Sequence, residues 1–271
     1  MPELPEVETT ARGIRPHVVG KTIIGVLVRN ARLRWPVPGN LPQHLIGNNI
    51  ETVERRAKYL LLRVSDGTVL IHLGMSGNLR ILPAATPAQL HDHVDLVFAD
   101  HTCLRLRDPR RFGAVLWCEG DPHQHKLLRA LGPEPLDAVF DGDYLFLATR
   151  KRTVDIKQFL MNQNIVVGVG NIYASEALFL ARINPRRAAG KITRDQCARL
   201  VVEIKNVLHY AITQGGTTLR DYVGSNGDTG YFQLKLNVYG REGEACMHCK
   251  SPIKQIRQGQ RSTFYCGKCQ K

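Results

Sequence analysis

The chain has 271 residues, and its 37 Lys and Arg residues outnumber 24 Asp and Glu residues, which gives a net charge of +13 and a pI near 9.6. With 43% hydrophobic residues, the composition is that of a folded chain with real cores and excludes a disordered one. No apolar run reaches the roughly 18 residues of a membrane-spanning helix, and the first residues lack the pattern of a secretory signal. The positive charge predicts a polyanionic partner, most often nucleic acid, and we expect a cytoplasmic protein.

The first three residues, Met1-Pro2-Glu3, carry the first indication of chemistry. An initiator Met before a small residue is usually removed, and Pro2 would then present a free secondary amine next to the carboxylate of Glu3. Such an amine attacks an aldehyde-level carbon and forms an iminium ion, and its reference pKa of about 8 leaves a usable fraction unprotonated. The alternative is that Pro2 merely follows the start codon.

The sequence pattern of residues 1 to about 130 predicts one helix followed by several short strands. Val7, Ala11 and Ile14 recur at helical spacing, and Pro16 is expected to end that helix. Ser65-Asp66-Gly67 predicts a hairpin turn, so the region is typical of an antiparallel sandwich or barrel. The expected strands are short β-branched or Leu-rich runs at Thr22–Val28, Tyr59–Val64, Thr68–Leu73, Asn78–Leu82, His93–Ala99 and Gly113–Cys118.

The second half of the chain has a helical pattern. Gly132-Pro133-Glu134-Pro135 is typical of a linker, and the turn-rich run at 226–230 predicts a mobile loop. Val166–Ile172 forms a Gly-rich turn before a helix, which suits either a phosphate or simple helix packing. The expected helices cover 142–149, 154–162, 172–181, 193–213 and 217–223.

Four of the seven cysteines form a metal-site pattern. Cys246, Cys249, Cys266 and Cys269 make two CxxC pairs separated by sixteen residues, which predicts a four-thiolate, tetrahedral zinc site on a hairpin that starts near Asn237. Four Cys ligands leave no open position, so one structural Zn²⁺ is expected. Four unpaired cysteines or two disulfides are poor alternatives in a reducing compartment. The isolated cysteines, Cys103, Cys118 and Cys197, are expected to be buried thiols.

Two short turns combine apolar and basic side chains. Asp108–Gly113 places Arg110, Arg111 and Phe112 on one turn, where an Arg can pair with phosphate or a base edge and a ring can enter a base stack. The alternative pairs one Arg with Asp108 and buries Phe112 in the core. Met75, in Gly74–Gly77, is either a core residue or an exposed one.

Further basic positions are candidates for phosphate contacts. Lys58 lies where a basic stretch leads into an apolar strand. Its side chain is expected to be either half-buried beside an anion or solvated at the end of the strand. His91 lies in His91-Asp92-His93, which lacks an obvious third metal ligand, so a polar loop or phosphate contact is expected. The others are Lys157, Arg152 within Arg150–Arg152, and Arg261 at the expected tip of the zinc hairpin.

Taken together, these motifs closely resemble the bacterial formamidopyrimidine-DNA glycosylase family over the full length. They are Met1–Glu8, the Lys58 segment, His72–Gly77, the Asp108–Gly113 turn, Val167–Glu176 and the four-Cys finger, in this order. The resemblance implies an α+β protein: an N-terminal antiparallel β-sandwich with a flanking helix, then a helix–two-turn–helix domain with a four-Cys zinc-finger hairpin. We expect domains at 1–131 and 153–236, a linker leading into the helices at 132–152, and the finger at 237–271.

The resemblance also implies function: a monomeric glycosylase and AP lyase of base excision repair, associated with the nucleoid, that acts on double-stranded DNA. It would excise 8-oxoguanine and formamidopyrimidines through a Pro2 Schiff base and cut the strand by β,δ-elimination. Implied catalytic residues are Pro2, Glu3, Lys58 and Arg261; implied intercalating residues are Met75, Arg110 and Phe112; implied DNA-backbone contacts are His91, Arg110, Arg152, Lys157 and Asn171.

Two positions depart from the family pattern, and two other functions stay open. Arg152 stands where Lys is expected, and Asn162 stands where Asp is common. The first alternative is an endonuclease VIII-like enzyme for oxidised pyrimidines, whose start usually reads Pro-Glu-Gly-Pro-Glu; Leu4 and the Arg110–Phe112 turn favour the purine enzyme. The second is a non-catalytic zinc-finger DNA-binding protein, which fits the charge and the finger but does not require Pro2, Glu3 or Lys58.

Overall fold

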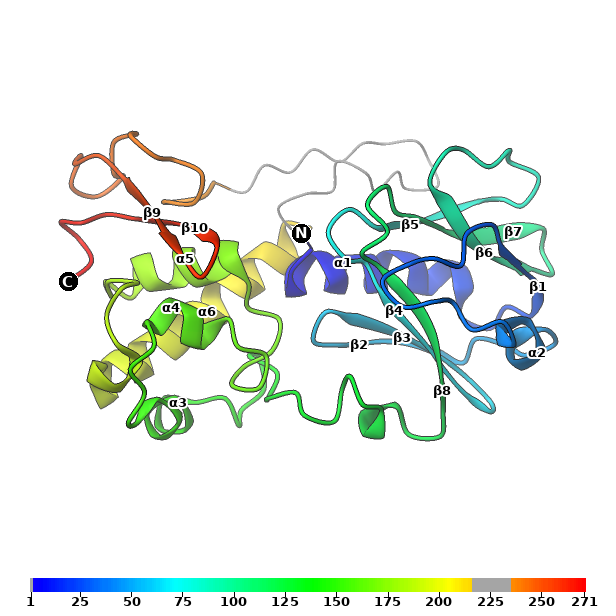
Figure 1. Ribbon diagram of the computed structural model, residues 1–271, viewed down its shortest axis with the longest axis horizontal. Helices are drawn as coiled ribbons and strands as arrows, with labels where there is room; N and C mark the ends of the chain where they lie inside the picture. Colours follow the sequence, from blue (N-terminus) through cyan, green and yellow to red (C-terminus); the bar gives the residue numbers. More distant parts are fainter. Residues whose placement is uncertain (1, 216–234) are drawn as a thin grey trace. The chain divides into compact units, whose positions relative to one another are not determined.

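The computed structural model of the chain describes residues 2–215 and 235–271, which form two compact units. One unit comprises residues 2–129, and the other comprises residues 130–214 with 235–271 (Figure 1). The helix expected at 217–223 and the loop expected at 226–230 lie outside the described residues. Within the described part of the chain, no helix is both long and apolar enough to cross a membrane.

Helix α1 (Leu4–Val18) opens the first unit and buries Val7, Ala11, Ile14 and Val18 on one face. The prediction that Pro16 ends this helix is wrong, because the helix continues two residues beyond it. Pro16 lies in the last turn, where its missing N–H removes a single intrahelical hydrogen bond, and a helix end tolerates that loss better than a helix interior.

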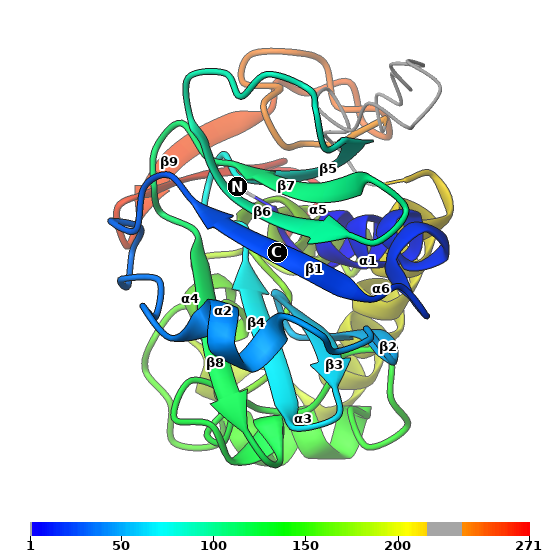
Figure 2. The same ribbon diagram turned by 90° about the vertical axis from the view of Figure 1, so that its right-hand side faces the viewer.

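Two four-stranded antiparallel sheets face each other and confirm the predicted sandwich (Figures 1 and 2). The first has the order β1-β6-β7-β5 and the second the order β2-β3-β4-β8. Ser65 and Asp66 form the predicted turn between β3 and β4. The strands are β1 (Ile23–Val28), β2 (Thr52–Arg56), β3 (Tyr59–Val64), β4 (Gly67–His72), β5 (Asn78–Pro83), β6 (Asp92–Phe98), β7 (Thr102–Arg107) and β8 (Ala114–Glu119), and a short helix, α2, spans Leu41–Leu45.

Strands β2 and β7 were not predicted, because charged residues interrupt their apolar patterns. In β7, Arg105 is 1% exposed, and its guanidinium pairs with Asp95 (2.8 Å) and Asp92 (3.5 Å) on β6. A buried charge needs such partners, and a pattern of hydrophobic residues cannot reveal them.

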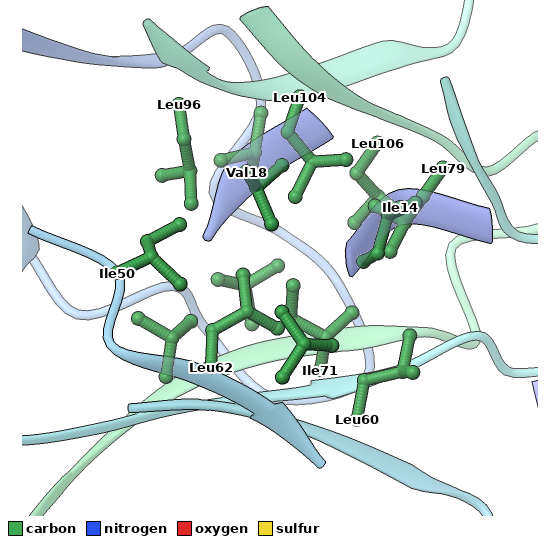
Figure 3. Packing of buried hydrophobic residues seen from close by; sticks show 14 of the residues in the cluster. Ile14, Val18, Ile50, Leu60, Leu62, Ile71, Leu79, Leu96, Leu104 and Leu106 are labelled. Carbon is green, nitrogen blue, oxygen red and sulfur yellow. The ribbon is translucent and has the colours of Figure 1, made fainter. Parts of the chain in front are cut away.

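The core of the first unit lies between the two sheets and includes one face of α1. Figure 3 shows side chains of the helix lying among those of both sheets. The labelled core residues are Ile14 and Val18 from α1, Leu79, Leu96, Leu104 and Leu106 from one sheet, Leu60, Leu62 and Ile71 from the other, and Ile50.

The second unit is helical, as predicted, with residues 132–135 in neither helix nor strand. Its longest helix begins at a capping box between Thr193 and Gln196 and buries Leu200, Ile204 and Leu208. The helices are α3 (Gly142–Thr149), α4 (Ile156–Leu160), α5 (Asn171–Leu180) and α6 (Arg194–Thr213), with short 3-10 turns at Ala189–Lys191 here and at Pro122–Gln124 in the first unit.

The four-Cys segment packs on α5 and forms the hairpin of β9 (Lys254–Gln258) and β10 (Arg261–Tyr265). Its small apolar cluster includes Phe179 of α5 together with Val238, Ile253 and Phe264. The isolated cysteines, Cys103, Cys118 and Cys197, are buried as predicted, and burial raises the pKa of all three thiols.

Candidate functional site

The N-terminal corner of the first unit is held at the start of α1. Glu3 is the N-cap residue and is 2% exposed, while Pro2 is half-buried. The Glu3 backbone N–H donates to Glu6 Oε2 over 2.8 Å and forms part of a capping box between these two residues. The N–H groups at the start of a helix favour a carboxylate there. Residues 2 and 3 therefore have a fixed backbone direction rather than that of a loose chain end.

Lys58 lies beside Ala57 in the two-residue turn between β2 and β3, and Ala57 has a positive φ of 55°. The Arg55 side chain ties this turn to α1, because its Nε donates to Glu8 Oε2 (2.9 Å) and its Nη1 donates to Ala57 O (3.0 Å). These contacts place the turn that carries Lys58 against the helix that begins next to Pro2 and Glu3. Lys58 is half-buried.

Met75 and Phe112 are apolar but remain 38% and 44% exposed, and Arg110 is exposed beside them. The Arg110 guanidinium lies over the Phe112 ring, 4.9 Å from its centroid. The alternative with Phe112 in the core and an Arg paired with Asp108 does not occur, because Asp108 binds Ser76 and the Gly113 backbone instead. Exposed apolar side chains at tight turns are available to enter a base stack.

His91 adjoins the same turn. Its φ of 78° is uncommon for a non-Gly residue, and such backbone strain is concentrated at functional sites. The His91 carbonyl accepts a hydrogen bond from Asp108 N over 3.0 Å, and its half-buried ring lies 6.3 Å from that of His93. The structure thus groups His91 with Met75, Arg110 and Phe112.

In the second unit, Arg261 is exposed next to the hairpin tip, as predicted. The turn residues Gly259 and Gln260 both have positive φ angles, 50° and 62°, which is the pattern of a two-residue type I′ turn. Such a turn follows the twist of its strands, so Arg261 is presented from a rigid position.

Lys157 and Asn171 are both buried under β10, with Lys157 only 1% exposed. Lys157 Nζ donates to Asn171 Oδ1 (2.6 Å), Thr263 Oγ1 (2.7 Å) and Ser262 O (3.3 Å). Asn171 Nδ2 also donates to Ser262 O, over 2.9 Å. The Lys157 ammonium therefore faces neighbouring protein groups, which does not fit the predicted direct contact with a phosphate.

Of the basic run at 150–152, Arg152 is exposed, whereas Arg150 bonds Phe146 O and Ile192 O and stacks on the Phe146 ring. The run closes α3 rather than opening the next helix. Asn162, the departure after α4, accepts a hydrogen bond from Asn164 N (3.0 Å) and so keeps a turn-forming role.

The four cysteines of the finger form a compact sulfur cluster. All four Sγ atoms lie within 4.8 Å of one another, with 3.9 Å between Cys246 and Cys269 and 3.4 Å between Cys249 and Cys266. A tetrahedral Zn²⁺ with Zn–S bonds of about 2.3 Å requires S···S distances of about 3.8 Å. The site fits one zinc ion, and four thiolates leave no position for a substrate.

Sequence reasoning missed two buried carboxylates that position these elements. Glu176 on α5 accepts hydrogen bonds from the backbone N–H groups of Asn237, Val238 and Tyr239 (2.7 to 2.9 Å) and so anchors the start of the finger. Asp108 joins turns in the first unit. For Glu176, a Glu within an apolar helix was the available signal, whereas the strand before Asp108 was itself not predicted.

His72, at the end of β4, supports the turn that carries Met75. Its Nδ1 accepts a hydrogen bond from Gly74 N over 2.9 Å. Burial lowers the pKa of His72 to about 4, and the nearby cations Arg34 and Lys58 lower it further, against a smaller opposing effect of Asp108. The ring is therefore neutral near pH 7, as an accepting Nδ1 requires.

Comparison with known domain families covers most of the chain. Residues 1–115 match the formamidopyrimidine-DNA glycosylase N-terminal domain, and residues 131–223 match the H2TH domain of the same enzymes. Residues 243–271 match the zinc finger found in FPG and IleRS, so the sulfur cluster is a zinc site and holds one structural ion.

Full-length relatives and solved structures agree with these matches. The chain is 62% identical to the formamidopyrimidine-DNA glycosylase of Thioalkalivibrio sulfidiphilus and 56% identical to that of Stutzerimonas stutzeri, over 100% of each chain. It also resembles Lactococcus lactis Fpg in complex with abasic-site DNA (34% identity, TM-score 0.91, 99% of each chain). A complex of a Lactococcus lactis FPG mutant with Fapy-dG DNA gives a TM-score of 0.92 at 34% identity and the same coverage.

Proposed function

The chain belongs to the formamidopyrimidine-DNA glycosylase family, and we propose from this premise that it excises oxidised purines from double-stranded DNA and then cuts the strand. The observation that carries the proposal is the placement of the Lys58 turn against the helix that begins next to Pro2 and Glu3, in a unit that also exposes Met75, Arg110 and Phe112. The relatives are named for formamidopyrimidines, which are ring-opened purines, and this favours oxidised purines over oxidised pyrimidines as the substrate class.

Within this function, Pro2 is the nucleophile once Met1 has been removed. Its nitrogen lone pair attacks C1′ of the damaged nucleotide, and the glycosidic bond breaks with its electron pair leaving on the base. Glu3, fixed at the N-cap, supplies or accepts protons at the sugar as the ring opens to the iminium.

Strand cleavage follows from the same intermediate, because the iminium acidifies the C2′ hydrogen. Loss of that proton expels the 3′ phosphate, and a second elimination expels the 5′ phosphate. In this scheme Lys58 stabilises a phosphate and assists the first elimination, and Arg261 assists the second. Their half-buried and exposed positions are compatible with these roles.

Exposed side chains of both units contact DNA in this proposal, and buried side chains support them. Met75, Arg110 and Phe112 fill the gap left by the extruded base, and Arg110 also contacts the orphaned partner and the backbone. His91 and Arg152 hold backbone phosphates. Asn171 contributes to the same backbone contacts, and the buried Lys157 acts on them through Asn171 and β10.

Each part of the chain can be assigned one role in this proposed function. We assign catalysis to residues 1–131, the linker to 132–152, helical DNA binding to 153–236 and finger contacts to 237–271. With DNA as its substrate, the protein is expected to work in the cytoplasm at the nucleoid. Zinc takes no part in these steps and only holds the finger.

The test is borohydride trapping on a duplex with one 8-oxoguanine opposite cytosine. The chain with a verified Pro2 N-terminus should become covalently linked to DNA, and a chain extended by one residue should not. Glu3→Gln should keep DNA binding and lose base excision, whereas Glu51→Gln, an exposed carboxylate of the same unit, should behave as the wild type. Full trapping by a chain with a verified blocked N-terminus would refute Pro2 as the nucleophile.

A further inference from the structure

Asp108 is fully buried directly after β7, and its carboxylate joins two separate turns. Oδ1 accepts a hydrogen bond from Ser76 Oγ (2.8 Å), and Oδ2 accepts one from Gly113 N (2.7 Å). Ser76 Oγ in turn accepts one from Arg110 N (3.2 Å). The turn that carries Met75 and the turn that carries Arg110 and Phe112 thus share one buried anion.

The same two turns also meet through their backbones. Gly74 has a φ of 63°, and a Cβ there would lie 2.4 Å from Phe112 C and 2.5 Å from Gly113 N. No side chain fits at that separation, so only glycine permits this approach. This packing is independent of the carboxylate, and it shows that the turns form one body rather than two loops that happen to be near each other.

The backbone of Asp108 adds a third segment. Its N–H donates to His91 O (3.0 Å), and its carbonyl accepts from His93 Nε2 (2.9 Å), which must be the protonated ring nitrogen because a carbonyl can only accept. All four polar atoms of Asp108 are therefore engaged, and they connect the segments that carry His91, Met75, Arg110 and Phe112.

We propose that Asp108 is the positioning residue that holds Met75, Arg110 and Phe112 as one preformed wedge, with His91 fixed beside it, before DNA is bound. The proposal rests on the DNA-binding roles given above. Side chains that are already placed lose less conformational freedom on insertion, and small displacements at such a site lower rates strongly. Asp108 does not touch DNA itself, and it acts through the turns that it joins.

Two variants test this role without removing an inserted side chain. Asp108→Asn removes the negative charge and one acceptor, while Ser76→Ala removes only the two hydrogen bonds that the Ser76 hydroxyl makes with Asp108 and Arg110 N. The matched control is Asp100→Asn, at the other end of β7, where a carboxylate binds Thr102 N and Oγ1 in an ordinary turn. Thermal melting checks that each variant is folded.

The first measurement is single-turnover excision of 8-oxoguanine opposite cytosine, from a duplex with 2-aminopurine next to the lesion, whose fluorescence reports unstacking. Asp108→Asn and Ser76→Ala should slow both excision and the fluorescence change by about 10- to 100-fold. Both should keep the wild-type yield of borohydride trapping on a single-stranded abasic oligonucleotide, where no base has to be extruded. Asp100→Asn should match the wild type throughout.

The second measurement does not depend on activity: hydrogen–deuterium exchange of peptides spanning 74–77 and 108–113. Both peptides should exchange faster in Ser76→Ala than in the wild type. Wild-type exchange in both turns, or a loss of abasic trapping parallel to the loss of excision, would overturn the proposal. Failure of the wild-type protein to excise or trap would instead overturn the proposed function, so the two failures are distinguishable.

Discussion

Two tight turns in this protein each present an arginine, and they are stabilised in different ways. Arg110 lies on a turn that follows β7, where a buried carboxylate and a large two-sheet core fix the backbone. Arg261 lies beside a two-residue hairpin turn in a segment with a small apolar cluster, four thiolates and polar contacts to α4 and α5. The first turn therefore depends on packing and a buried carboxylate, whereas the second depends on a metal.

The distinction follows from the amount of core that each segment can build. A segment of about 35 residues buries too little apolar surface to be stable alone, so a bound metal must supply the difference. The finger is also anchored to the helices by hydrogen bonds to two buried charged side chains, Glu176 and Lys157. The effect of losing the metal on the finger should therefore be larger than the effect of losing one anchor.

Removal of a zinc ligand should produce the largest effect. Cys249→Ser leaves three thiolates, and structural zinc is worth about 10–16 kcal/mol in isolated finger peptides, so we expect the finger to unfold. DNA binding should be lost, and the sandwich should remain folded. Elemental analysis, DNA affinity and a melting curve with two transitions measure these outcomes.

Cys118→Ser is the matched control for this loss, because Cys118 is a buried thiol of the sandwich outside the sulfur cluster. It should retain one zinc per chain and wild-type DNA affinity. Unchanged affinity in a verified metal-free Cys249→Ser sample would contradict the dependence of the finger on its metal.

Loss of the buried anchor should have a smaller effect than loss of zinc. Lys157→Met keeps the length of the side chain but leaves Asn171 Oδ1 and Thr263 Oγ1 without their donor. Each buried polar group left unpaired costs about 1–3 kcal/mol. We expect faster hydrogen exchange across 254–265 with zinc retained, and slower second elimination because Arg261 is less well placed.

Lys205→Met is the control for this anchor. Lys205, on α6, is half-buried and donates to Asp137 O over 2.8 Å, away from the finger, so its loss should leave exchange in the finger unchanged. If Lys157→Met exchanges as slowly as the wild type across 254–265, the buried ammonium does not hold the hairpin.

The sandwich should respond to pH through His72. The unfolded state takes up a proton below pH 6.5, while the folded-state pKa of His72 is lowered to about 4 by burial. This stability is fully present above pH 6.5 and is lost as the pH falls toward 4, by about 1.4 kcal/mol per pH unit. In His72→Asn, an amide oxygen can still accept from Gly74 N, and the slope due to His72 should disappear.

Urea unfolding at pH 7 and pH 5 measures this difference, with His101→Asn, an exposed histidine of the same unit, as the control. Equal slopes for the wild type and His72→Asn would show that the ring titrates alike in both states and does not support the Met75 turn as a neutral acceptor.

The sequence allowed the sandwich, the helices and the zinc hairpin to be predicted, because apolar periodicity and Cys spacing are local signals. It missed β7, where Arg105 interrupts the pattern and is compensated by Asp95 on another strand. The same limit applies to Lys157, whose partners Ser262 and Thr263 are more than a hundred residues away. Buried charges depend on contacts that only the folded chain brings together.

The smallest effect is expected for Arg152, an exposed arginine of the helical unit, and its kind should differ from that of Arg110 on the sandwich turn. Arg152 is exposed outside any helix, so Arg152→Ala should remove one phosphate contact. Binding to damaged and undamaged duplex should weaken alike, and the slope of log affinity against log salt should shrink by about one, since each neutralised phosphate contributes about −0.9. Salt titrations of both duplexes measure this slope.

Arg110→Ala should differ in kind from Arg152→Ala, because the Arg110 guanidinium is stacked on Phe112 within the preformed wedge. Loss of a bidentate base contact costs about 1–3 kcal/mol, so the preference for cytosine over adenine opposite the lesion should fall. Excision opposite all four bases compares the two variants directly. A uniform loss in Arg110→Ala with the wild-type ranking of opposite bases would make Arg110 a phosphate contact like Arg152, and the two turns would then present their arginines for the same purpose.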